Sequence, residues 1–181
     1  MIFAIASFAQ SNVHIKFMGI PVTGTIAQFQ AKLVAKGCIY NKVASATIPN
    51  GTRAFKGTFV GNKVDIFVYY DTKTKVVYRT KAVVSGVSKD IAEQEYSKVK
   101  NLLSQKYVSD FDDIFVGTQG GKESVSFVSA NDEGEINGLI DLFITQDEET
   151  WVRAPYNYNL HIDYNDRINT NNHENQQLDE I

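Results

Sequence analysis

Acidic side chains and histidines are the groups in this sequence that could do chemistry. The acidic residues gather in three polar stretches: Asp110, Asp112 and Asp113; Asp132, Glu133 and Glu135; and Asp147, Glu148 and Glu149. Calcium is bound by oxygen ligands of this kind, but the loop pattern Asp-x-Asn-x-Asn-Gly with a later glutamate is absent. We therefore interpret the three groups as solvated loop charges and predict no metal site from them.

Histidine and cysteine give no stronger signal. His14, His161 and His173 stand on separate segments, without the His-x-x-x-His spacing of a zinc site. His161 and Asp163 share one face of an expected strand, which by itself describes a surface pair. Cys38 is the only cysteine, so neither an intrachain disulfide nor a cysteine-based zinc site can form. We predict no catalytic, cofactor-binding or metal-binding residues, and no cofactor.

Two motif patterns and the net charge argue against other classes. Residues 117–122 are rich in glycine and end in a lysine, but the phosphate-loop spacing and a following helix are missing, so a turn between strands is expected. The Gly-x-Ser-x-Gly motif of many hydrolases is absent. The net charge of −3 lacks the positive excess that phosphate backbones attract, so no nucleic-acid partner is expected.

The first nine residues predict where the protein goes. Residues 1–9 are apolar and stop at a polar triplet, with small residues at Ser7 and Ala9, as at the end of a secretory signal peptide. No lysine or arginine precedes Lys16, so we interpret the segment as a truncated signal peptide with Met1 an internal methionine. An ordinary buried first strand is the alternative. We expect a soluble periplasmic or secreted protein, because no other apolar run approaches the ~20 residues of a membrane span.

The elements that must position any site begin with a unit over residues 13–87. Residues 13–17 alternate as a short strand, and residues 24–36 carry apolar residues at helical spacing behind a cap at Thr23 or Thr25. Three antiparallel strands follow, joined by a two-residue turn at 61–62 and a three-residue loop at 72–74. These turns predict the following opposed pairs: Phe59 and Val64, Gly57 and Ile66, Phe55 and Val68, Lys75 and Asp71, Arg79 and Phe67, and Lys81 and Asp65. The core face is then expected to continue with Val76, Tyr78, Thr80 and Ala82.

Residues 88–166 predict a second unit. Its expected elements are a helix at 89–107, strands at about 113–117, 123–129 and 136–145, a hairpin at 147–148 leading into 150–153, and a regularly alternating strand at 156–165. Residues 167–181 are expected to form a polar tail, or a short helix docked by Leu178 and Ile181.

A short internal repeat links the two units. Residues 64–67 (Val-Asp-Ile-Phe) are echoed by residues 140–143 (Ile-Asp-Leu-Phe), and each hairpin follows one helix. We therefore predict an α+β fold of two tandem helix-plus-antiparallel-strand units, with the helices packed on one face of a sheet.

The opposite face of the first sheet is the candidate binding face. It carries Lys56, Phe67, Tyr69, Arg79 and Lys81, with Asp65, Lys75 and Val77 beside them. Two aromatic rings are expected there among cationic side chains, with no neighbouring element of the sequence to cover them. Such a surface suits a protein partner or a glycan. The alternative is that the second unit, the tail or a missing N-terminal segment covers this face.

Several segments carry a resemblance to known proteins. Residues 17–25, 29, 32–33, 36–37, 57–59 and 160–164 resemble a widespread group of small exported proteins of unknown function from Bacteroides-type bacteria, and the resemblance covers most of the chain. It implies no catalytic residues. The expected tandem units are also similar in architecture to the beta-lactamase inhibitor protein, a likeness of fold that carries no evidence of inhibition.

We expect an exported, non-enzymatic protein that binds a macromolecule or a small ligand through a sheet face. One alternative is a small periplasmic hydrolase of unrecognised type, which requires a pocket where His161, Asp163 and a further acid converge. The other is an inhibitor or immunity-type protein, which requires a concave sheet that exposes Phe67, Tyr69 and Arg79. The sequence does not indicate which partner is bound or which oligomeric state is formed.

Overall fold

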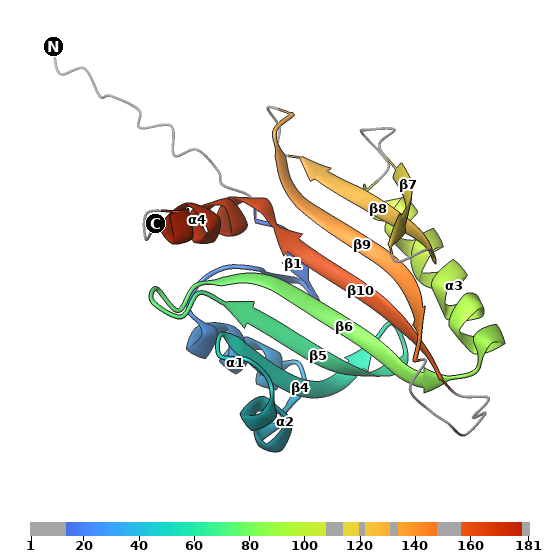
Figure 1. Cartoon of the computed structure of the whole chain (residues 1–181), viewed down its shortest axis with the longest axis horizontal. Coiled ribbons are helices and arrows are strands. Elements are labelled where there is room, and N and C mark those ends of the chain that lie inside the picture. Colours follow the sequence, from blue (N-terminus) through green and yellow to red (C-terminus); the bar gives the residue numbers. More distant parts are fainter. Residues whose placement is uncertain (1–13, 108–113, 120–121, 131–133, 148–156, 179–181) are drawn as a thin grey trace, which may run out of the picture.

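The computed structural model of the protein describes residues 14–107, 114–119, 122–130, 134–147 and 157–178. The predicted signal peptide and the predicted strand at 150–153 lie outside these residues. In chain order the elements are β1 (Lys16–Phe17), β2 (Ile20–Pro21), α1 (Ile26–Ala35), β3 (Ile39–Tyr40), α2 (Lys42–Thr47), β4 (Thr52–Phe59), β5 (Asn62–Tyr70), β6 (Val77–Val87), α3 (Lys89–Tyr107), β7 (Ile114–Gln119), β8 (Lys122–Ala130), β9 (Ile136–Gln146), β10 (Tyr158–Asp166) and α4 (Arg167–Leu178). Figure 1 shows them as an α+β fold.

Within the described residues, eight strands form one antiparallel sheet in the order β3-β4-β5-β6-β10-β9-β8-β7. Strands β1 and β2 form a separate hairpin. The last strand of the chain, β10, lies in the middle of the sheet between β6 and β9 (Figure 1). Its pairing with β6 runs from Tyr158 opposite Val87 to Asn165 opposite Arg79.

The predicted architecture of two tandem units is therefore wrong, although the fold is α+β. One continuous sheet replaces the two tandem helix-plus-strand units with helices on one face, and the repeated segments lie on β5 and β9 of that sheet. The helices are not arranged one per unit either, because α2 packs at the β4 edge and α4 follows the end of β10. Unpaired edges of β6 and β10 would each expose backbone hydrogen-bonding groups, and pairing the two strands satisfies both. The expected similarity of this chain to proteins built of tandem units is therefore also wrong.

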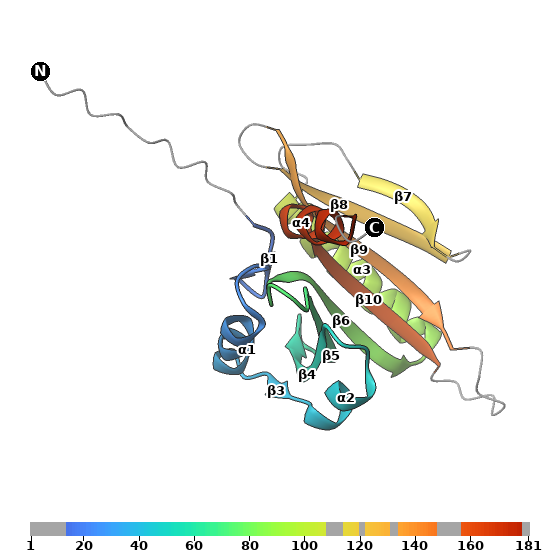
Figure 2. The ribbon, with the colours of Figure 1, turned by 60° about the vertical axis from the view of Figure 1, so that its left-hand side comes forward.

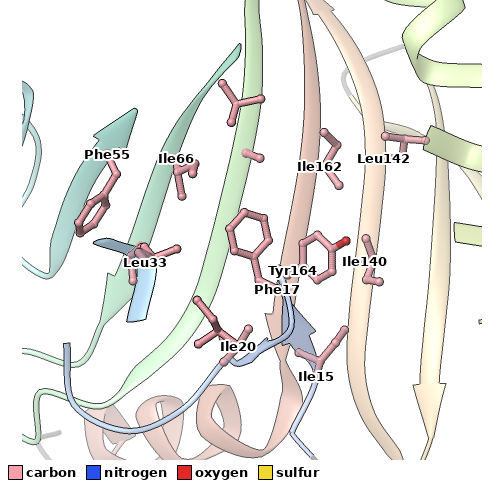
Figure 3. Packing of buried hydrophobic residues seen from close by; sticks show 14 of the residues in the cluster. Ile15, Phe17, Ile20, Leu33, Phe55, Ile66, Ile140, Leu142, Ile162 and Tyr164 are labelled. Carbon is pink, nitrogen blue, oxygen red and sulfur yellow. The ribbon is translucent and has the colours of Figure 1, made fainter. Parts of the chain in front are cut away.

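The core lies on the inner face of the sheet, where α1, α3 and the β1–β2 hairpin pack. Figure 2 shows α3 running along the central strands, and Figure 3 shows the ring of Phe17 beside that of Tyr164. The buried cluster joins side chains from all these elements, among them Ile15, Phe17, Ile20, Val22, Phe29, Leu33, Phe55, Ile66, Val68, Val77, Ala82, Val99, Leu103, Phe127, Ile140, Leu142, Leu160 and Ile162. Residues 15–22 therefore belong to the core although they contribute only a short hairpin.

The predicted first helix is confirmed, and its start has a capping box. The Thr25 hydroxyl accepts a hydrogen bond from the Gln28 N–H at 3.4 Å, and Gln28 Oε1 accepts one from the Thr25 N–H at 3.0 Å. Gly37 follows the end of α1 with φ of 85°, a left-handed conformation that glycine adopts without steric cost. The predicted helix at 89–107 coincides with α3.

The first hairpin confirms the predicted faces, but the predicted register is wrong. Phe59 pairs with Asn62 instead of Val64, because the turn is made by Val60 and Gly61 with φ of 51° and 83°. The slip is two residues. Because side chains alternate with a period of two, every residue returns to the face that the sequence predicted.

The β5–β6 connection differs more from the predicted one. A bulge sets Tyr70 opposite Val77 and Tyr69 opposite Arg79, where Arg79 was predicted opposite Phe67. Val77 is consequently fully buried in the core, although we predicted it on the binding face. Its two neighbours in sequence, predicted in the core, are only partly buried. Lys75 was also predicted on the binding face, and it lies in the turn with φ of 63°.

Residues 167–178 form helix α4, the second of the two forms expected for the C-terminal segment. Asn169 docks it, because its side-chain amide donates to the carbonyl oxygens of Val22 at 3.0 Å and Val77 at 3.1 Å. Leu178 was expected to dock the helix but is 66% exposed. Ile181 lies outside the described residues.

Candidate binding face

The five predicted binding-face residues lie on the outer face of the sheet, opposite the core. Three cross-strand pairs bring them together: Lys56 with Asp65, Phe67 with Lys81, and Tyr69 with Arg79. Each of the five keeps at least partial solvent exposure. Lys56 and Asp65 also form an ion pair at 3.2 Å. The sequence therefore identified a set of side chains that the fold assembles on one surface.

The centre of the outer face is an ion pair between β6 and β10. Both oxygens of Asp163 accept hydrogen bonds from Arg79, from Nε at 2.8 Å and from Nη2. The Arg79 side chain is 38% exposed and that of Asp163 only 5%. The hydrogen bond to Asp163 raises the pKa of Arg79 against the opposing effect of burial, so the guanidinium stays charged. The same guanidinium lies 4.9 Å from the centre of the Tyr69 ring, which fixes its orientation further.

A second group of rings and cations continues the outer face onto β9. Lys81 Nζ lies 5.3 Å from the centre of the Phe143 ring, and His161 stacks on that ring at 4.7 Å with an interplanar angle of 9°. His161 Nε2 and Thr145 Oγ1 form a hydrogen bond of 2.7 Å. Burial lowers the pKa of Lys81, and the nearby charge of Asp163 opposes that shift. These contacts hold the side chains in place, so a partner would have little left to order on binding.

The two ends of the outer face differ. At one end an open hollow of about 420 Å³ is lined by residues that include Ile39, Lys56, Lys63, Asp65, Val83 and Ser85. At the other end α4 borders the face, where the Thr170 hydroxyl donates a hydrogen bond of 2.6 Å to Asn165 Oδ1. The row with Tyr69 and Arg79 adjoins the α4 end.

His161 and Asp163 lie on the same face but have different partners. Asp163 gives both oxygens to Arg79, whereas His161 bonds and stacks with residues of β9. The other two histidines pair with acids elsewhere: His14 with Asp166 and His173 with Asp71. Within the described residues, no three acidic, histidine or cysteine side chains come together in a way that could hold a metal ion.

A second polar cluster joins α4 to the β5–β6 turn. His173 Nδ1 lies 2.7 Å from Asp71 Oδ2, and the histidine ring stacks on Tyr78 at 4.5 Å. Asp71 Oδ1 accepts hydrogen bonds from the N–H groups of Lys73 at 2.9 Å and Thr74 at 2.6 Å, and from the Thr74 hydroxyl at 2.9 Å. Burial disfavours the charged carboxylate, but these hydrogen bonds outweigh it and lower the pKa of Asp71 to about 2.

The lowered pKa of Asp71 predicts that the protein loses stability in acid. The pKa of Asp71 falls from 3.8 to about 2 on folding, so the ionised group stabilises the fold above about pH 4 and the contribution is lost as the pH falls through 2. Because solvent reaches the turn, we expect the contribution to be about 1 kcal/mol. Urea unfolding of the wild type and of Asp71→Asn measures it. The difference between their free energies of unfolding should shrink by about 1 kcal/mol between neutral pH and about pH 2.

The control for this experiment is Asp147→Asn, which changes an exposed acid that follows β9. Its difference from the wild type should stay nearly constant over the same pH range. A constant difference for Asp71→Asn as well would contradict the stabilising role assigned to the ionised Asp71.

Comparison with known proteins assigns the chain to no family. No family model matches it, and neither the curated proteins nor the solved structures show a significant match. Among the described helices, none combines the length and the apolar character needed to cross a membrane. The function is therefore argued from the outer face itself.

Proposed function

We propose that this chain is an exported, non-enzymatic binding protein that engages a partner protein through the outer face of its sheet. The observation that carries the proposal is the cluster of Tyr69, Arg79 and Asp163. Tyrosine and arginine are the residue types that most often dominate the binding energy of protein interfaces. Here the arginine fork is held in one orientation before a partner arrives, which reduces the entropy lost on binding. Export is proposed from the signal-like residues 1–9.

A protein suits this face better than a glycan. A sugar ring would stack on an open aromatic face, but Lys81 and His161 both lie against Phe143, and Arg79 lies over Tyr69. The face also carries charges of both signs in ion pairs, which a protein partner can match residue by residue. The Arg79 side chain is 38% exposed and Tyr69 is partly exposed, so both remain available for such contacts.

Two substitutions on the outer face should weaken binding. Tyr69→Ala removes a ring, and Arg79→Lys keeps the positive charge but cannot reproduce the bidentate fork. Each should reduce affinity for the partner about 30-fold, which corresponds to the roughly 2 kcal/mol loss of an interface hot spot. The immobilised wild type captures the partner from an envelope extract of the source cells, and titration of the purified partner then gives the affinities.

Lys89→Ala is the matched control, because this lysine on α3 is 63% exposed and lies away from the outer face. It should bind the partner as the wild type does. If Tyr69→Ala and Arg79→Lys both retain wild-type affinity while folded, the outer face is not the binding site. A captured protein lost equally by Lys89→Ala would not be a partner of this face.

A further inference from the structure

Helix α4 turns polar side chains toward the rest of the molecule. Asn169, Asn172, His173 and Gln176 recur at the spacing of one helical face, and this face borders the β5–β6 turn. A helix packed on a protein ordinarily presents apolar residues there. The only buried residue of α4 is an asparagine, Asn169. The polar face stabilises the fold less than an apolar one would, and sites that break such a rule are often functional.

An open cavity of about 350 Å³ lies between this helical face and the turn. Apart from Val76, every described residue of its walls is polar. Four of the wall residues carry side-chain amides: Asn169, Asn172, Asn175 and Gln176. The volume is at the lower end of the range of small-molecule sites. The cavity shares no residue with the outer-face cluster of Tyr69, Arg79 and Asp163.

The charges around the cavity exclude strongly charged ligands. Among the described residues that line it there is no lysine or arginine, so an anion would find no such cation there to pair with. Its one carboxylate, Asp71, is already satisfied, because Oδ1 accepts three hydrogen bonds from the turn and Oδ2 pairs with His173. A cation would therefore have to compete with hydrogen bonds that lower the pKa of Asp71. Apart from this paired carboxylate, the described residues give the cavity a neutral polar lining.

The amide groups match one kind of neutral ligand. Each amide offers two N–H donors and a carbonyl acceptor, and a sugar hydroxyl both donates and accepts. Among the described residues, Gln176 lines the cavity and its Oε1, itself buried, has no hydrogen-bond partner, so rotation of this side chain would bring a free acceptor to a ligand hydroxyl. Buried polar atoms without partners cost stability unless a ligand or solvent satisfies them. We propose that the cavity beneath α4 binds a neutral polyhydroxylated ligand the size of a monosaccharide.

Nuclear magnetic resonance of the full chain tests this site with four probes: glucose, galactose, mannose and N-acetylglucosamine. At about 10 mM, roughly tenfold above a dissociation constant near 1 mM, at least one sugar should cause saturable shifts. The side-chain amide signals of Asn172, Asn175 and Gln176 should move most. Asn172→Ala should weaken binding about fivefold, because it removes a hydrogen-bonding group.

Asn101→Ala is the matched control, since Asn101 is an exposed asparagine on α3, and it should leave the sugar affinity unchanged. Acetate and N-methylacetamide, at the same concentration, test the ligand class. The proposal is overturned if no sugar gives saturable shifts, if acetate or N-methylacetamide gives equal shifts, or if Asn172→Ala binds as tightly as the wild type. The Tyr69→Ala variant should bind the sugar normally, which keeps this test separate from that of the outer face.

Discussion

Replacing Phe17 with alanine is expected to lower the free energy of unfolding by about 3–5 kcal/mol, as truncations of fully buried phenylalanines do. The Phe17 side chain has no solvent exposure. Its ring stacks on Phe59 at 5.2 Å and meets the edge of Tyr164 at the same distance. The alanine variant would leave a cavity between the N-terminal hairpin and two strands of the sheet. Urea unfolding followed by circular dichroism measures the loss.

The control is Ile39→Ala, which truncates an apolar side chain that is 70% exposed on β3. It should change the free energy of unfolding by no more than about 0.5 kcal/mol. A loss at Phe17 as small as the loss at Ile39 would mean that the N-terminal hairpin does not complete the core. Within the described residues the hairpin β1–β2 forms no strand pairing with the eight-stranded sheet, so side-chain packing is one of its links to the sheet beside a few hydrogen bonds, and this variant tests the packing directly.

Local patterns in the sequence were enough to predict most elements and their faces. Alternation in β10 predicted that Leu160 and Ile162 share one face and that His161 and Asp163 share the other, as found, and the first pair lies in the core. Alternation cannot tell which strand lies next to which, because it defines a face and not a neighbour. The pairing of β6 with β10, and with it the contact of Arg79 with Asp163, therefore could not be predicted.

The error in the predicted register of the first hairpin has a physical cause. A two-residue hairpin turn of this kind needs positive φ at both central residues, which favours asparagine and glycine. These preferences predicted a turn at Gly61 and Asn62. The chain uses Val60 and Gly61, although positive φ is unfavourable for a β-branched residue. Packing of the paired strands outweighs this local preference, which no inspection of the turn alone reveals.

The contacts of α4 were missed for a different reason. We looked for apolar docking residues in the C-terminal segment, and its polar composition predicted a tail. The helix is instead held by Asn169 and His173, whose partners lie directly after β2, on β6 and in the turn between β5 and β6. A polar residue at helical spacing is usually solvated, so the pattern carried no signal. Only the buried partners distinguish Asn169 and His173 from the exposed polar residues around them.

A single acid connects the N-terminal segment to this helix. Asp166 ends β10 and has no solvent exposure. Its Oδ2 accepts a hydrogen bond from the Ile15 N–H at 3.2 Å and lies 3.0 Å from His14 Nδ1. Its Oδ1 accepts the Asn169 N–H at 2.9 Å, as an N-cap residue does at the start of a helix. Three parts of the chain thus meet at one carboxylate.

Replacing Asp166 with alanine should therefore lower the free energy of unfolding by about 3–5 kcal/mol, because each buried N–H left without an acceptor costs roughly 1–3 kcal/mol. Urea unfolding measures the loss, and hydrogen exchange should show the amides of Ile15 and Asn169 losing protection. Asp65→Ala is the matched control on the outer face, where the ion pair with Lys56 is partly exposed and worth less than about 1 kcal/mol. Equal losses of stability for the two variants would mean that Asp166 stabilises the fold no more than an exposed acid does. A loss several times larger at Asp166 would mean that the carboxylate holds the hairpin and α4 on the sheet together.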